Sequence, residues 1–209
     1  MDDLDKALGD ISSIRRQVAR STEFRGYGPA TMAATSVFAI AAAYVQANWL
    51  RDPAANLSSY LGTWILTAIV SAALIGVQTV TRSHRMHSGM ADEMIRMAVE
   101  QFLPSAAAGV LMTIVLVSAA PSASWMLPGL WQVIFGLGVF SSCRFLPRPM
   151  MIAGGWYVLT GLACVALGGA RALSPWAMGV PFGAGQLLVA AILYFVSEEE
   201  NAEEDGDET

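Results

Sequence analysis

Five stretches of this chain contain no Asp, Glu, Lys or Arg, and each is long enough to cross a membrane. They run over residues 26–50, 53–81, 101–143, 149–170 and 172–197. A spanning helix needs about 20 mostly apolar residues to cover a hydrocarbon core of about 30 Å. An isolated charge inside that core costs about 2.5 kcal/mol or more. The sequence therefore predicts an all-α protein that is solvated by a lipid bilayer.

The number of spans follows from the lengths of these stretches. The stretch 101–143 is about twice as long as one span needs to be, and the proline and serines of "APSASW", from Ala120 to Trp125, suit a short turn within it. Six spans in three hairpins are therefore predicted. Their expected bounds are 29–49, 59–80, 102–120, 125–143, 150–170 and 176–196.

Glycines recur at helical spacing in the last three of these spans. Small residues on one face let helix backbones approach closely, which drives packing in lipid, where no hydrophobic force acts between helices. The pattern predicts a compact bundle. The glycines concerned are Gly129, Gly136, Gly154, Gly161, Gly168, Gly179 and Gly183.

Positive charge indicates how the spans are oriented. Ten of the 12 Lys and Arg residues lie in the N-terminal segment, in the loop 81–101 and in the loop after the fourth span. Only Arg51 and Arg171 lie on the opposite side. Because Lys and Arg are enriched in cytoplasmic loops, both termini are expected in the cytoplasm. The expected location is the plasma (inner) membrane.

Two segments flank the predicted transmembrane domain, which covers residues 26–197. Residues 1–25 are expected to form a cytoplasmic amphipathic helix, and their acidic beginning, "MDDLDKALGD", lacks the basic and apolar regions of a signal peptide. Residues 198–209 carry eight acids among 12 residues. Because these like charges repel one another, the tail is expected to be disordered.

The N-terminal helix is predicted from its apolar periodicity over residues 2–22. Apolar residues fall at alternating steps of three and four, a seam compatible with a coiled coil. Acids precede bases along the helix, which matches the sign of its dipole. Self-association, contact with anionic lipid and binding of a cytoplasmic protein all fit this pattern. The seam residues proposed to bind a partner are Leu4, Ile11, Ile14 and Val18.

A second candidate interaction surface lies in the loop 81–101. Met90, Met94 and Met97 follow one another at steps of four and three, which predicts a methionine stripe on a helix that continues into the third span. Flexible thioether surfaces of this kind can bind partners. The alternative is that the stripe packs against neighbouring cytoplasmic turns.

The same loop holds the only two histidines of the chain, His84 and His87. On a helix they would share a face, but a zinc site requires four ligands, or three and a water molecule. No further histidine exists in the sequence. We therefore predict no metal site and assign the histidines to a basic cap at the anionic lipid surface.

Two glutamines suggest where a ligand cavity could lie. Gln132 follows Trp131 one turn beyond Pro128, and Gln186 lies in the glycine-rich sixth span. Proline and glycine breaks free backbone groups that neighbours, water or a ligand must satisfy. The residues Trp131, Gln132 and Gln186 therefore mark a candidate cavity between the fourth and sixth spans. The alternative is that the glutamines only form hydrogen bonds between helices.

The sequence carries no motif of an enzyme or of a nucleotide-binding protein. No catalytic residue, cofactor or nucleic-acid partner is therefore expected. The leading hypothesis is a non-enzymatic interaction, regulatory or sensory module of the membrane, which uses its N-terminal helix and the 81–101 loop to engage a cytoplasmic protein or a second copy. The alternative is a small transporter or permease for a neutral or lipid-like solute.

Overall fold

The structure is a computed structural model that describes residues 28–50, 52–86, 89–143 and 146–207. For residues 82–86, 89–96, 98 and 199–207 it describes the helical backbone alone. The predicted amphipathic helix of residues 1–25 lies outside the described residues. All regular elements of the described chain are helices.

Within the described residues, six helical segments are long and apolar enough to cross a membrane, which confirms the predicted number of spans. The first two long helices are α2 (Pro29–Trp49) and α3 (Leu57–Met86). They are followed by α4 (Gly89–Ala119), a 3₁₀ turn η1 (Pro121–Met126), α5 (Leu127–Ser142) and α6 (Met150–Leu167). The short α7 (Gly169–Ala172) precedes α8 (Pro175–Asp207). Proline occupies the first turn of α2 and of α5, where its missing N–H costs nothing.

Several helix ends differ from the expected bounds. The fifth span was expected to reach residue 170, but α6 ends at Leu167 because Gly168 adopts a φ of +67°, which only glycine tolerates easily. Gly168 is therefore a helix end and contributes nothing to the predicted glycine stripe. The helices α3 and α4 extend beyond their expected spans, to Met86 and from Gly89, and α8 continues to Asp207, into the segment expected to be disordered.

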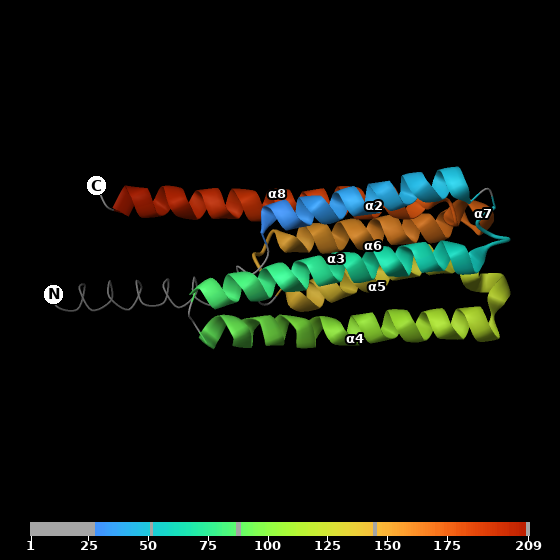
Figure 1. Ribbon diagram of the computed structural model, residues 1–209, viewed down its shortest axis with the longest axis horizontal. Coiled ribbons are helices and arrows are strands. Elements are labelled where there is room, and N and C mark those ends of the chain that lie inside the picture. The colour runs from blue at the N-terminus through green and yellow to red at the C-terminus, as the bar shows by residue number, and fades with distance from the viewer. Residues whose placement is uncertain (1–27, 51, 87–88, 144–145, 208–209) are drawn as a thin grey trace, which may run out of the picture.

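The helices form an elongated bundle in which α2 begins and α8 finishes at the same end, here named the terminal end (Figure 1). The opposite end, where α2 finishes and η1 and α7 lie, is named the far end. A cluster of buried apolar side chains from α2, α6 and α8 surrounds Met32 towards the terminal end. A second cluster around Tyr60 and Leu127 joins the helices towards the far end.

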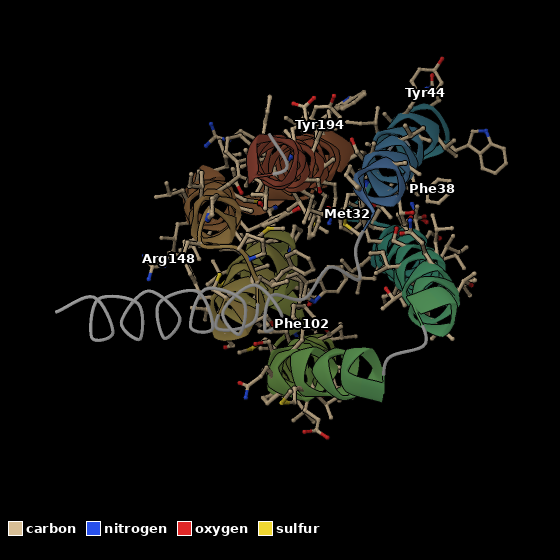
Figure 2. The ribbon with its side chains drawn as sticks, turned by 90° about the vertical axis from the view of Figure 1, so that its left-hand side faces the viewer. Met32, Phe38, Tyr44, Phe102, Arg148 and Tyr194 are labelled. Carbon is tan, nitrogen blue, oxygen red and sulfur yellow. The ribbon has the colours of Figure 1, made fainter. Side chains whose placement is uncertain are left out.

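The closest helix pairs are not the pairs that the predicted three hairpins would favour. The most extensive contacts join α2 to α8, and α5 to α6, whereas the hairpin partners α2 and α3 share far fewer. Figure 2, which views the bundle from the terminal end, shows α5 near the middle, and Phe102 of α4 lies towards it. Phe38 and Tyr44 point away from the bundle.

Glycines explain why α5 and α6 approach so closely. A Cβ atom at Gly161 would lie 2.6 Å from the carbonyl oxygen of Gly129, and one at Gly136 would lie 2.8 Å from the carbonyl oxygen of Gly154. These pairs lie seven residues apart on two antiparallel helices, so backbone meets backbone at both levels. The predicted glycine spacing is therefore used between the fourth and fifth spans.

The pair of α2 and α8 is built in the same way from small residues. Gly179 faces Ala43, and a Cβ atom at Gly183 would lie 2.6 Å from Cδ1 of Ile40. Side chains of α2 therefore pack against these two glycines of α8, which brings the first and last spans together.

The helices α3 and α4 occupy the rim of the bundle. No residue of the described stretch Val99–Ala119 is buried. Partly buried positions of α4 recur every three or four residues, as expected when one narrow stripe contacts a neighbour. Within Val99–Ala119 they are Phe102, Ser105, Gly109, Thr113 and Leu116. The rest of α4 therefore faces the surroundings of the protein, which for an apolar span means lipid.

Candidate functional site

Gln132 lies at the centre of the predicted cavity and is fully buried. Its side-chain amide nitrogen donates a hydrogen bond of 2.9 Å to the carbonyl oxygen of Ala177 on α8 and lies 3.7 Å from the sulfur of Met178. Its side-chain oxygen accepts no hydrogen bond from the described residues. Gln132 therefore joins α5 to α8, as the alternative interpretation of the glutamines expected.

Trp131 points to a different neighbour, although it precedes Gln132 directly. Its indole N–H donates a hydrogen bond of 2.8 Å to the hydroxyl oxygen of Thr113 on α4. Successive residues of a helix point about 100° apart, so one of the two contacts α4 and the other α8. The structure therefore separates Trp131 from the predicted cavity.

Gln186 lies next to an aromatic residue that the sequence did not single out. The ring of Tyr157 on α6 lies so close over Gly185 that a Cβ atom there would overlap the phenol. The side-chain oxygen of Gln186 is buried and accepts no hydrogen bond from the described residues.

Aromatic rings pack on the helices that carry the two glutamines. Phe135 of α5 is the centre of this cluster, and its ring centroid lies 4.7 Å from that of Tyr157 and 5.5 Å from that of Phe182. The ring of Phe102 on α4 also packs against Phe135, at 5.5 Å. Edge-to-face packing at these distances is favourable. The cluster therefore joins α4, α5, α6 and α8.

A recess opens at the far end of the bundle, away from the predicted cavity. It lies where the connections between the helices meet, and none of the described residues that line it is charged. Its walls are formed by Ala54, Leu57, Pro121, Ser122, Ser124, Trp125, Gly169, Ala170 and Leu173.

Gln46 of α2 is a buried polar residue that sequence reasoning missed. Its side-chain oxygen accepts a 3.0 Å hydrogen bond from the indole N–H of Trp64, and its amide nitrogen donates one of 3.2 Å to the carbonyl oxygen of Tyr60. Both partners belong to α3. The signal that could have found it was an amide side chain inside an apolar span, with a tryptophan at the same depth of the next span.

Gln78 links the same two helices near the terminal end. Its side-chain oxygen lies 3.4 Å from the backbone nitrogen of Gly28, one of the N–H groups that the start of α2 leaves without a helical partner. Together, Gln46 and Gln78 hold α3 to α2 at two levels, although few other residues of these helices touch.

The predicted interaction surfaces are only partly described. Met90, Met94 and Met97 lie on α4, as expected for a stripe on a helix that continues into the third span, and Met97 is partly buried. The residues Leu4, Ile11, Ile14 and Val18 lie outside the described residues. The side chains of His84 and His87 lie outside them too. Among the side chains that the structure describes, no three of His, Cys, Asp or Glu gather as metal ligands would.

The fold and these buried amides define a multi-pass, all-helical membrane protein whose spans are joined by uncharged polar contacts. Comparisons with protein-family models, with curated proteins and with solved structures find no match for the chain.

Proposed function

We propose that this protein is a non-enzymatic interaction module of the membrane, which engages a cytoplasmic protein or a second copy through its N-terminal helix and the 81–101 segment. One observation carries the proposal. The helical backbone continues beyond the apolar parts of α3 and α4, from Thr81 to Met86 and from Gly89 to Val99 (Figure 1). The methionine stripe therefore lies on a helical projection at the terminal end.

The packing of the core supports the same proposal. The predicted route for a solute between α5 and α8 contains a hydrogen-bonded Gln132 and the rings around Phe135. Such a core suits a transmembrane domain that serves as a rigid support for the interaction surface of the 81–101 segment. Pumps and charged-ion pathways, in contrast, normally carry ionisable groups at depth.

Chemical crosslinking in native membranes tests this function. Deletion of residues 1–22, or the triple change Met90→Ala, Met94→Ala and Met97→Ala, is expected to abolish the crosslinked product that the complete chain forms. Met112→Ala is the matched control, because Met112 is an exposed methionine of the same helix inside the apolar span. The proposal fails if the product survives both changes or if the complete chain forms none.

The orientation belongs to the same proposal. Both termini and the 81–101 segment are placed in the cytoplasm, and the membrane is the plasma (inner) membrane. Support comes from the asymmetry of Lys and Arg, and from the common position of the start of α2 and the finish of α8 (Figure 1).

A small transporter or permease for a neutral or lipid-like solute is the second candidate. The unpaired side-chain oxygens of Gln132 and Gln186 favour it, because buried polar groups normally have partners and a polar solute could supply them. Solute uptake into proteoliposomes that is lost when Gln132→Leu and Gln186→Leu are combined would support transport. Uptake equal to that of empty liposomes for the unchanged chain would exclude it for the solutes tested.

A further inference from the structure

The last helix contains a proline in its interior. Pro181 lies seven positions into α8 counted from Pro175, and it has no backbone N–H. In a regular helix the N–H of residue 181 would bond to the carbonyl oxygen four residues earlier, which belongs to Ala177. That carbonyl oxygen therefore needs another donor.

Gln132 supplies this donor. Its amide nitrogen lies 2.9 Å from the carbonyl oxygen of Ala177, and its side chain is fully buried. The bond comes from a neighbouring helix, so it replaces an internal bond of α8 with a bond between α5 and α8.

A second side chain acts one helical turn further along α8. The indole N–H of Trp156 on α6 donates a hydrogen bond of 2.9 Å to the carbonyl oxygen of Pro181 itself. Carbonyls next to a helix break tilt outward and can accept such bonds. Two neighbouring helices thus hold the backbone of α8 on either side of the residue that weakens it.

The neighbourhood of Pro181 is also rich in glycine. Gly179, Gly183 and Gly185 flank it, and residues without side chains resist bending least. The first two contact Ala43 and Ile40 of α2, so α2 supports α8 before and after the break. The side towards α5 and α6 is held by the two side-chain donors.

We propose that Pro181 is a hinge in α8 and that Gln132 and Trp156 are the latch that holds it. Release of the latch lets the outer part of α8, from Pro175 to Val180, change its angle to the part that continues to the terminal end. This device does not depend on the proposed partner or on transport.

Distances between two spin labels on α8 test the hinge in the complete chain. Trp176→Cys and Tyr194→Cys place the labels on either side of Pro181, at positions 43% and 52% exposed. Helical rise separates them by about 27 Å. Cys143→Ser and Cys164→Ser remove the native thiols, and serine at position 164 keeps a donor towards the carbonyl oxygen of Ala172.

The proposed latch predicts how the distribution of distances between the two labels changes in width when a hydrogen-bond donor is removed. Gln132→Met keeps the length of the side chain but removes the donor, so the width is expected to increase by about twofold as the break is freed. Adding Pro181→Ala returns an N–H to the Ala177 carbonyl. The combined variant is therefore expected to be as narrow as the parent.

Trp156→Phe provides an independent variant that keeps most of the ring volume, and it is also expected to broaden the distribution. Trp131→Phe is its matched control, because it removes the same N–H from a bond to Thr113 on the other side of α5. The hinge is refuted if both Gln132→Met and Trp156→Phe leave the width unchanged. It is also refuted if Pro181→Ala fails to restore the narrow distribution, or if Trp131→Phe broadens it equally.

Discussion

At the scale of single residues, uncharged amides join the helices of this protein where charges would be too costly. Gln46 forms hydrogen bonds with two groups of α3, and Gln78 accepts one from the backbone at the start of α2. Gln132 donates a hydrogen bond to a carbonyl oxygen of α8. An amide can donate and accept at once, so one side chain can serve two partners. Membrane helices thereby gain directional contacts without the cost of an ion in hydrocarbon.

Gln46→Leu is expected to lower the free energy of unfolding in detergent by about 1 kcal/mol, the usual range for a polar contact between membrane helices. The loss arises because the Trp64 N–H and the Tyr60 carbonyl oxygen each lose a partner. Denaturant titration followed by tryptophan fluorescence measures it.

Asn48→Leu is the control for this change. Asn48 is exposed, and its amide donates only to the carbonyl oxygen of Tyr44 in the same helix. We expect a change near zero. Equal losses for the two variants would contradict a specific role of Gln46.

The candidate site shows what residue patterns can and cannot predict. The sequence singles out Gln132 as a polar residue near a proline inside an apolar span. Its partner was not, because the carbonyl oxygen of Ala177 becomes available only through Pro181, 49 residues later in the chain than Gln132. Tyr157 was missed because a tyrosine inside a span has no distinctive spacing.

At the scale of the helices, small residues decide which pairs come closest. The carbonyl oxygens of Gly129 and Gly154 lie where a methyl group on α6 or α5 would have to go. Contacts of this kind depend on the absence of a side chain, so they tolerate no enlargement.

Gly161→Ala is expected to destabilise the protein by about 1–3 kcal/mol, the usual cost of overpacking. The added methyl group would lie 2.6 Å from the carbonyl oxygen of Gly129, and neither backbone can yield without separating α5 from α6. Thermal unfolding in detergent micelles, followed by circular dichroism, measures the change.

Gly155→Ala on the same helix is the matched control. A Cβ atom at Gly155 would meet nothing within 4 Å, so only the better helix propensity of alanine acts. The expected effect is neutral or stabilising by up to about 1 kcal/mol. Destabilisation by both variants would show that this contact does not decide the stability of the pair.

The spans could be predicted from the sequence more fully than their arrangement. Charge-free length, together with the turn signal at residues 120–125, located the six spans of the described chain, because the cost of a charge in lipid is large and local. The partner of each helix depends on which small residues meet across the bundle. Gly129 could be seen in the sequence, but nothing in the chain indicated that it faces Gly161 rather than the sixth span.

At the scale of the whole molecule, the start of α2 and the finish of α8 share one end, and the recess with η1 and α7 lies at the other (Figure 1). If the proposed orientation is correct, every connection at the far end is outside the cell. The end of the bundle that holds the termini is then the end rich in Lys and Arg, and the far end is the end poor in them.

Labelling of single cysteines with a membrane-impermeant maleimide tests this orientation. In a background with the native cysteines replaced, Ser122→Cys and Ala170→Cys are expected to react in intact cells, whereas Arg148→Cys is expected to react only in inside-out vesicles. All three positions are exposed. The reverse pattern would overturn the cytoplasmic placement of the termini, and reaction of all three from one face would overturn the arrangement of the spans.

The position of α4 at the rim has a consequence for how the sequence can change. A fluid of acyl chains imposes no shape on the residues that touch it, so Leu103, Val110 and Ile114 can exchange with any other apolar residue. The glycines between α5 and α6 have no such freedom. After random mutagenesis and selection for folded protein, the outer side of α4 should therefore accept many different aliphatic residues. The contact positions of α5 and α6 should accept almost no substitution.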